Sequence, residues 1–357
     1  MARKKTRSPR GGKGLDSSGI CFLNPAQVGG IETSVLDDGP GRGVRIAWFN
    51  TGTPLRFKVV IDRGLDIADA FYGGCSLSYL SYVGTVPPNR AIDRDKEWLK
   101  TFFAGLLTSC GPVHMQGEIV EGMEYGQHGP HSNTPAAVES IVQPDPASGI
   151  TAMSITGVMR TARMFGPNLE LRRTIRAELG SPCIHIHDRF FNRGNQKLPH
   201  SWLLHINFGW PLLAEGARFV YRGPLRPWRP EVDTEWFTDP KWYKTVQAPS
   251  PRHVATGEAV ALIDPPADPD GQCHMGLANP ALGLAVEVVF PKSQFPRMLN
   301  WQHMGPRGEY VSGMEPISFD PYAGTEYLQP GQIKEYECCL RVHDAADDIA
   351  RFLRRWG

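Results

Sequence analysis

Short runs in which apolar and polar residues alternate recur along most of the chain. A period of two is typical of a β-strand with one buried and one exposed face. It is clearest over Leu169–Leu179 and Ile184–Phe191. Further strands are expected over residues 44–49, 56–61, 217–222, 284–290 and 336–342. The 38 glycines and 31 prolines place turns between these runs, so the pattern predicts a mostly β chain of many strands.

Helical periodicity is expected in two places. Glu97–Leu107 can form a short helix with its aromatic residues on one face. The C-terminal signal is clearer, because Ile349, Phe352, Leu353 and Trp356 follow helical spacing. Aspartates lie at the start of this helix and arginines lie near its end, as the helix macrodipole favours. We expect the C-terminal helix to cover one face or end of the sheets.

The charge of the chain is unevenly placed. Residues 1–14 carry six Lys and Arg and no acid, and the formal net charge of the whole chain is +1, so the remainder carries −5. With almost no apolar residues, residues 1–15 are expected to be a basic disordered tail. Residues 16–357 show no internal repeat and no linker, and we expect one β-sandwich domain. The folded body offers no field for nucleic acid, and no apolar stretch is long enough for a membrane span.

The cysteine pattern and the absence of several known motifs reduce the number of possible functions. Seven cysteines, odd in number and without a CxxC pair, suit reduced thiols in the cytoplasm. The sequence contains no Walker loop, no GxGxxG after a strand, no GxSxG elbow and no zinc-finger pattern. Nucleotide binding and serine hydrolase chemistry are therefore disfavoured.

Three distant segments place ionisable groups in apolar or glycine-rich surroundings: QHGPHSN at 127–133, WLLHINFG at 202–209 and YVSGMEP at 310–316. A buried polar group without a partner costs several kcal/mol, so each of these groups must find one. If the segments converge, they bring two imidazoles and a carboxylate into one pocket. Such a set is the minimum needed for proton transfer by acid–base catalysis.

Glu315 and His205 are the strongest candidates. Pro316 removes a backbone donor, so we expect Glu315 at the end of a strand, where pockets open. A carboxylate among apolar neighbours has a raised pKa unless a cation or donors hold it ionised. His205 shares a strand face with Asn207, a polar pair that a dry core disfavours. The structural alternatives are a carboxylate that caps a turn and a satisfied core histidine.

The 127–133 segment is flanked by glycine and proline and is expected to be a loop. Its two histidines, His128 and His131, are three residues apart, a spacing that also suits two metal ligands. The alternative is a set of turn-forming polar residues at the surface. We favour a functional role for His128 over one for His131.

Arg63 and Gln302 are weaker candidates. Arg63 lies between Asp62 and Asp66 at the end of an apolar strand, and a guanidinium suits multidentate binding of hydroxyls or carboxylates. A surface ion-pair network is the equal alternative. Gln302 lies between Trp301 and a histidine in the segment before Glu315 and is expected to line the same pocket.

Five motifs, in this order, carry a resemblance to a known family: DRGLDI (62–67), FAGLLTSCG (103–111), QHGPHSNTPA (127–136), LLHINFGWPLL (203–213) and YVSGMEP (310–316). They resemble the aldose 1-epimerase (galactose mutarotase-like) superfamily, and more closely its less characterised epimerase-like branch, from about residue 18 to 342. The resemblance implies an all-β fold, a galactose mutarotase-like β-supersandwich with a short C-terminal helix. It also implies a sugar pocket on the concave face.

The same resemblance implies roles for the candidates. Glu315 is then the base that takes the proton of the anomeric hydroxyl, and His205 the acid that protonates the ring oxygen. No cofactor is expected. The mid-chain aspartate with which mutarotases hold sugar hydroxyls has only Asp239 as a weak counterpart here. By this resemblance His128 and Arg63 would bind the sugar. Asn207, His131 and Gln302 are further sugar-binding candidates, named from their own positions in the sequence.

Two other functions stay open. His128, His205 and Glu315 could instead hold a divalent metal, which would suit an epimerase, isomerase or lyase acting on a keto or acidic sugar. A carbohydrate-binding protein that kept the fold and lost turnover is the third possibility. The expected partner in each case is a small sugar.

Overall fold

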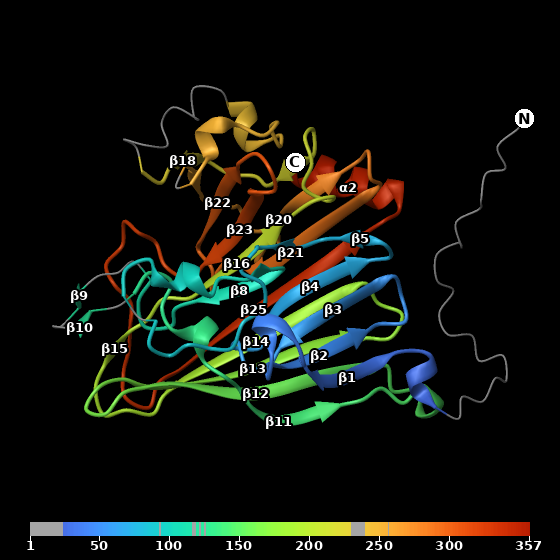
Figure 1. The fold of residues 1–357 in the computed structure, drawn as a ribbon. Coiled ribbons are helices and arrows are strands. Elements are labelled where there is room, and N and C mark those ends of the chain that lie inside the picture. Colours follow the sequence, from blue (N-terminus) through green and yellow to red (C-terminus); the bar gives the residue numbers. More distant parts are fainter. Residues whose placement is uncertain are drawn as a thin grey trace, which may run out of the picture.

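The computed structural model describes residues 24–92, 94–115, 119–120, 123–124, 126–229, 240–255 and 257–357. Two large antiparallel sheets make up most of it (Figure 1). The predicted tail over residues 1–15 and the candidate Asp239 lie outside the described ranges. No helix within these ranges is both long enough and apolar enough to cross a membrane.

The first sheet has 11 strands, in the order β1-β2-β3-β4-β8-β16-β23-β22-β19-β18, and β5 pairs with β4. Every strand pair in it is antiparallel. Its strands are β1 (Gly30–Val35), β2 (Arg45–Asn50), β3 (Leu55–Val60), β4 (Asp66–Tyr72), β5 (Cys75–Ser76), β8 (Leu107–Cys110), β16 (Leu203–Phe208), β18 (Leu225–Pro227), β19 (Ala259–Ile263), β22 (Arg297–Met304) and β23 (Tyr310–Ile317).

The second sheet has eight strands, in the order β11-β12-β13-β14-β25-β21-β20-β17. They are β11 (Ala137–Val142), β12 (Ala152–Ala162), β13 (Asn168–Glu178), β14 (Cys183–Asn192), β17 (Arg218–Val220), β20 (Gln272–Asn279), β21 (Leu284–Pro291) and β25 (Ile333–His343).

Short elements connect the sheets. Three two-stranded ladders join β6 (Tyr79–Leu80) to β7 (Ala104–Gly105), β9 (Ile119–Val120) to β10 (Met123–Glu124), and β15 (Leu198–Pro199) to β24 (Tyr327–Leu328). The 3₁₀ turns are η1 (Pro25–Gln27), η2 (Gly39–Gly41), η3 (Glu97–Lys100), η4 (His131–Asn133), η5 (Pro146–Ser148), η6 (Pro240–Tyr243) and η7 (Pro251–His253).

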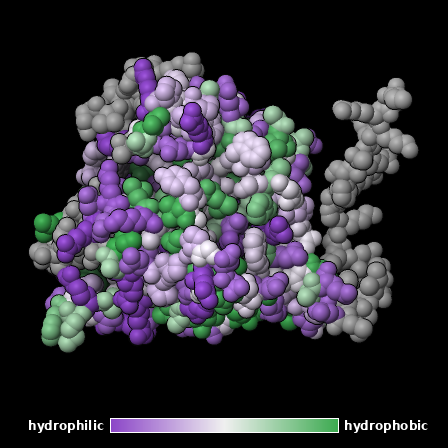
Figure 2. Space-filling model, viewed as in Figure 1, coloured by the Kyte–Doolittle hydropathy of each residue, from purple (hydrophilic) through white to green (hydrophobic). Residues whose placement is uncertain are grey.

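The main core lies between the two sheets. It joins residues such as Phe49 and Phe57 of the first sheet to Ile175 and Phe190 of the second in one apolar cluster. Because successive side chains of a strand point to opposite faces, each strand gives alternate residues to this core. Figure 2 shows hydrophilic residues over much of the outer surface in this view. The mostly β sandwich expected from the sequence is confirmed.

All seven predicted strands are present, with ends shifted by up to three residues. The C-terminal helix is also confirmed, as α2 (Ala346–Trp356). It buries Phe352 and Trp356 against Ala278 and Ala285 on the outer face of the second sheet. This amphipathic helix therefore covers one end of that sheet (Figure 1).

The predicted helix over Glu97–Leu107 is wrong beyond its first turn. Only η3 (Glu97–Lys100) is helical. Ala104 and Gly105 adopt left-handed backbone angles, with φ of 60° and 69°, which end any right-handed helix. The chain then enters β8, whose apolar residues are buried. Burial in the sheet outweighs the local helical spacing.

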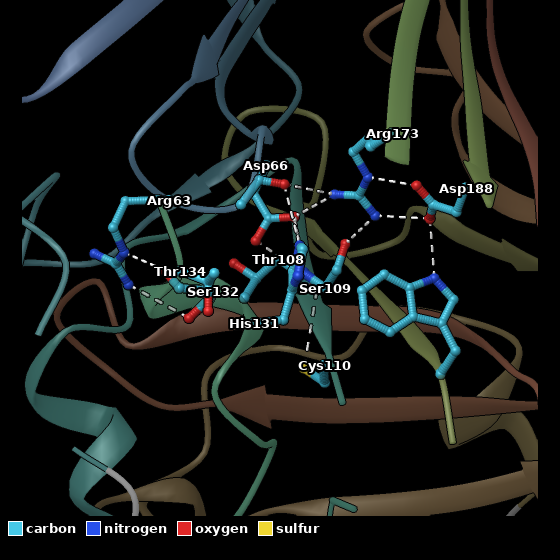
Figure 3. A network of polar contacts seen from close by, with 12 residues as sticks. Arg63, Asp66, Thr108, Ser109, Cys110, His131, Ser132, Thr134, Arg173 and Asp188 are labelled. Carbon is cyan, nitrogen blue, oxygen red and sulfur yellow. Dashed lines mark hydrogen bonds and ion pairs between the residues drawn. The ribbon is translucent and has the colours of Figure 1, made fainter. Parts of the chain in front are cut away.

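A buried ionic network joins the two sheets (Figure 3). Arg173 of β13 reaches across the core, and its Nη1 lies 2.8 Å from Asp66 Oδ1 on β4. Its Nε and Nη2 donate to the two oxygens of Asp188 at 2.6 and 2.8 Å. Nη2 also donates to Ser109 Oγ of β8 at 2.8 Å. The side chains of Arg173, Asp66 and Asp188 are at most 1% exposed.

Further donors complete this network. The Ser109 amide donates to Asp66 Oδ2 at 3.0 Å, and Trp202 Nε1 donates to Asp188 Oδ2 at 2.9 Å. Burial raises the pKa of Asp66 to about 6, although the Arg173 guanidinium and these hydrogen bonds oppose the rise. Arg173 is thus the counterion that both carboxylates contact.

Replacing Arg173 by Met should lower the free energy of unfolding by about 3–5 kcal/mol, because two carboxylates lose their buried counterion. Urea unfolding measures this. Arg176→Met is the matched control on the same strand, since Arg176 pairs only at the surface, with Glu178. Its effect should stay within about 0.5 kcal/mol. Equal effects of the two substitutions would contradict a central role for the network.

Candidate active site

His205 and Glu315 meet across two neighbouring strands of the first sheet. The pairs Leu203↔Ile317 and Ile206↔Met314 set the register of β16 against β23 and place His205 opposite Glu315. The imidazole Nε2 lies 3.2 Å from the carboxylate Oε1. The two residues are 4% and 3% exposed. Strand pairing alone thus brings together two residues that are 110 positions apart.

Glu315 does not lie at a strand end, as the sequence suggested. β23 continues through Pro316, which is in register with Met298 of β22. On the other side, the ladder between β16 and β23 lacks bridge partners between Leu203↔Ile317 and Ile206↔Met314. The proline that cannot donate a hydrogen bond coincides with this interruption. The polar pair therefore sits within the sheet.

Gly313 makes room for the carboxylate. Residues 313 and 315 share one face of β23, and a Cβ on Gly313 would lie 2.1 Å from Glu315 Oε1. Gly313 is paired with Asn207 on one side and Trp301 on the other. The Trp301 ring lies 5.3 Å from the His205 ring, centre to centre. A glycine here lets the carboxylate fold back over its own strand.

His128 joins the pair from the 127–133 loop. Its ring centre lies 5.7 Å from that of His205, and its backbone is left-handed, with φ of 65°. Two backbone bonds hold it: its amide donates to Met115 O at 2.7 Å, and its carbonyl accepts from the Gly111 amide at 2.9 Å. The predicted convergence of the three segments is thus present.

Aromatic rings enclose the two imidazoles. Phe102 lies edge-on to His205, with ring centres 5.6 Å apart. Trp98 lies edge-on to His128 at 4.2 Å. Trp301 is a third aromatic ring, beside His205. Low-polarity walls strengthen every charge–dipole interaction inside them.

Several polar atoms at this place have no hydrogen-bond partner within the described residues: His128 Nδ1, His205 Nδ1, Asn207 Oδ1, Trp98 Nε1 and Glu315 Oε1. Buried polar atoms are nearly always paired, so such a gathering needs a reason. It marks a place where the hydroxyls of a ligand, or an ion, can supply the missing partners.

Burial sets the protonation of the pair. It raises the pKa of Glu315 well above its usual value, and the nearby Glu258 carboxylate adds to the rise. It lowers the pKa of His205 to about 4, with the Asn207 side chain opposing the fall. It also lowers the pKa of His128 to about 3, and His205 adds to that effect. Burial therefore favours the protonated carboxyl of Glu315 and the neutral imidazole of His205.

Glu258 and Arg229 form a polar edge that was not predicted. Trp301 Nε1 donates to Glu258 Oε2 at 2.6 Å, and Arg229 Nη1 lies 2.7 Å from Glu258 Oε1. Both charged side chains are about one-third exposed. The one available signal in the sequence is that Glu258 directly precedes the apolar run of β19. Trp98 and Phe102 were likewise missed as site residues, because their segment was expected to be a helix.

Arg63 and His131 do not face the His205–Glu315 pair. Arg63 is fully buried, and its guanidinium donates to the carbonyls of Ser132, Thr101 and Val86. His131 Nε2 lies 3.1 Å from Gly64 O. Figure 3 shows both residues beside the Asp66 network. Their contacts support the loops that carry Phe102 and His128.

Asn207 and Gln302 were both expected to line the pocket, and the structure places them on opposite faces of the sheet. Asn207 shares the face of His205, and its Nδ2 donates to the His205 carbonyl at 2.9 Å. Gln302 lies on the other face of β22, where its Nε2 donates to Trp242 O and Asn300 Oδ1. The expectation that Gln302 lines the pocket is therefore wrong. Side chains alternate along the strand, so its neighbour Trp301 faces the site instead.

A metal at His128, His205 and Glu315 would need these side chains to move. Within the described ranges, one group of three potential ligands has all its donor atoms within 4.8 Å of one another, and it lies elsewhere, at Cys183, His185 and Cys339. The donor types of the first trio nevertheless suit a divalent ion.

Comparisons with known proteins agree with this architecture. A "putative aldose 1-epimerase" from Klebsiella pneumoniae is 23% identical, with 91% of this chain and 86% of that chain covered and a TM-score of 0.80. A galactose mutarotase-like protein from Clostridium acetobutylicum is 12% identical, with coverage of 88% and 98% and a TM-score of 0.59. No curated protein matches the chain.

The family comparison covers most of the chain. A model described as a domain of unknown function, DUF4432, matches residues 41–337. The solved structures are below 25% identity and show the fold. The chain therefore belongs to the DUF4432 family and has a galactose mutarotase-like fold.

Proposed function

We propose that this protein is a carbohydrate-active isomerase of the aldose 1-epimerase type, with Glu315 and His205 as its proton-transfer pair. The observation that carries the proposal is the 3.2 Å contact between two buried, oppositely titrating side chains. Paired groups whose environments push their pKa values apart are typical of acid–base sites. The mutarotase-like fold supports a sugar as the substrate.

The proposed reaction moves two protons and breaks one bond. The Glu315 carboxylate takes the proton of the anomeric hydroxyl O1, and His205 Nε2–H gives a proton to the ring oxygen O5. The C1–O5 bond breaks while C1=O1 forms, which leaves an open-chain aldehyde. After rotation about C1–C2, the two transfers reverse and the ring closes with the opposite anomeric configuration. Each side chain recovers its starting proton.

The resting protonation state fits this cycle. A protonated carboxyl beside a neutral imidazole holds as many protons as a carboxylate beside an imidazolium. The two forms differ only in whether Glu315 or His205 holds the proton, and their Oε1 and Nε2 atoms lie 3.2 Å apart. The first form serves ring closure and the second serves ring opening. Because O1 and O5 are bonded to the same carbon, two groups this close together can address both oxygens.

The surroundings supply sugar contacts. The apolar ring faces of Trp301 and Trp98 suit the C–H face of a pyranose. The unpaired atoms His128 Nδ1 and Asn207 Oδ1 can bond hydroxyls. These contacts orient C1 over the pair, and such orientation is itself a large part of catalysis.

A metal-dependent epimerase, isomerase or lyase on a keto or acidic sugar is the second candidate. The donor types of His128, His205 and Glu315 favour it, and these side chains would have to move for one ion to contact all three. A bound ion would supply Lewis-acid polarisation of a carbonyl. This candidate would be favoured if the purified wild type holds one metal ion per chain and the His205→Asn variant holds none.

Glu315→Gln should slow anomer exchange by about 10²- to 10⁴-fold, the usual worth of one positioned acid or base. The amide keeps the shape but cannot accept the proton. Saturation-transfer NMR across aldoses, uronic acids and keto-sugars measures the exchange. Glu335→Gln, at an exposed position of the second sheet, is the control and should be unchanged. No acceleration by the wild type on any sugar would contradict the proposal.

Gly313→Ala should reduce exchange although Gly313 offers the substrate no functional group. The new Cβ would lie 2.1 Å from Glu315 Oε1 and must displace the carboxylate from His205. We expect a loss in kcat approaching that of Glu315→Gln, with unfolding still cooperative. Gly324→Ala, where a Cβ meets nothing within 4 Å, is the matched control. An unchanged kcat in Gly313→Ala would show that the carboxylate position is not critical.

The pH profile of exchange should be wide. The active pair holds one proton between Glu315 and His205. It gains a second below about pH 4, where His205 protonates, and loses the first above the raised pKa of Glu315. The rate should therefore fall toward pH 4, and the raised pKa of Glu315 sets its limit on the alkaline side. Intrinsic fluorescence at each pH checks that the chain stays folded, and an acidic limb centred near pH 6.5, the ordinary pKa of histidine, would contradict this assignment.

A further inference from the structure

A second group of reactive side chains lies on the outer face of the second sheet. Cys183 and His185 are alternate residues of β14, and Cys339 lies on the adjacent β25, directly opposite His185. Their neighbours Ile186 and Cys338 belong to the core between the sheets. Because strand side chains alternate, the three therefore point away from that core.

The donor atoms of this group are already close. One ligand atom from each of Cys183, His185 and Cys339 lies within 4.8 Å of the other two. Zn²⁺ binds sulfur at about 2.3 Å and imidazole nitrogen at about 2.0–2.1 Å, so tetrahedral ligand atoms lie about 3.4–3.8 Å apart. The three atoms would therefore have to approach one another by roughly 1 Å to bind one ion.

A fixed positive charge also lies beside this group. Arg341 is the residue opposite Cys183 on β25. Thiolate is the form of cysteine that binds metals.

We propose that Cys183, His185 and Cys339 form a zinc site, with water as the fourth ligand. A set of two sulfurs and one imidazole binds zinc in preference to calcium or magnesium. His185 is exposed, so an ion can enter from solvent. The site is independent of the proposed sugar chemistry, because it lies on the other sheet. Its effect is to cross-link β14 and β25 in the middle of the second sheet.

The test is a titration of the reduced, full-length protein with Co²⁺ as an optical probe for zinc. Thiolate ligation gives a charge-transfer band in the near ultraviolet, which histidine and carboxylate ligands do not give. We expect one Co²⁺ per chain, displaced by Zn²⁺. Cys183→Ser and Cys339→Ser should each abolish the band and weaken Co²⁺ binding by at least about 100-fold. Loss of a residue that only supports a metal ligand already weakens binding by about 10- to 100-fold, so loss of a ligand should cost more.

Two matched variants serve as controls. Cys75→Ser removes a half-buried thiol of the first sheet, and His187→Gln removes the next histidine on the same face of β14. Both should keep the band and the affinity. Thermal unfolding in EDTA checks that Cys183→Ser folds as the wild type does, and added Zn²⁺ should raise the Tm of the wild type only.

Three results would overturn the proposal. One is the absence of a thiolate band with Co²⁺ in the reduced wild type. Another is a band that survives Cys183→Ser. The third is stoichiometric binding that is lost in His205→Asn rather than in the cysteine variants, which would assign the ion to the candidate active site.

Discussion

The side chain of Arg173 is the constraint on which the rest of the structure depends. It crosses the core between two sheets and holds Asp66 and Asp188, which face it from different strands. Three buried charges can persist in an apolar interior only if their geometry is closely satisfied. The network therefore fixes how β4 and β8 lie over β13 and β14. Through Ser109 and Trp202 it reaches the strand ends that lead directly to the candidate site.

The site is a product of strand register. His205 and Glu315 are opposite residues of β16 and β23, at a point where Pro316 coincides with a break in the ladder and Gly313 leaves space beside the carboxylate. Burial then does the chemical tuning, because it disfavours both charged forms and leaves one proton shared between two groups. Neither residue would have this property at the surface. The scaffold thus shifts the pKa values of a glutamate and a histidine in opposite directions.

The two sheets present different chemistry on opposite sides of one core. The first gathers imidazoles, a carboxyl and aromatic walls around His205. The second carries thiols and a histidine on its outer face, at Cys183, His185 and Cys339. Strand alternation explains both, since each strand that contributes Leu204 or Ile186 to the core must present its neighbours on the other face. A β-sandwich can therefore hold separate sites without altering its core.

The sequence alone determined the strands and the C-terminal helix, through period-two alternation and helical spacing, and it marked three segments by their ionisable groups in apolar or glycine-rich surroundings. These features are local, so the pattern of apolar residues is sufficient to reveal them. Only the tertiary structure decided that Gln302 points into the core, that Glu315 lies within a strand, and that Arg63 and His131 support loops. It also decided that Glu97–Leu107 leaves the helix after one turn. These outcomes depend on register and on long-range packing, which join residues far apart in the chain and leave no local pattern in the sequence.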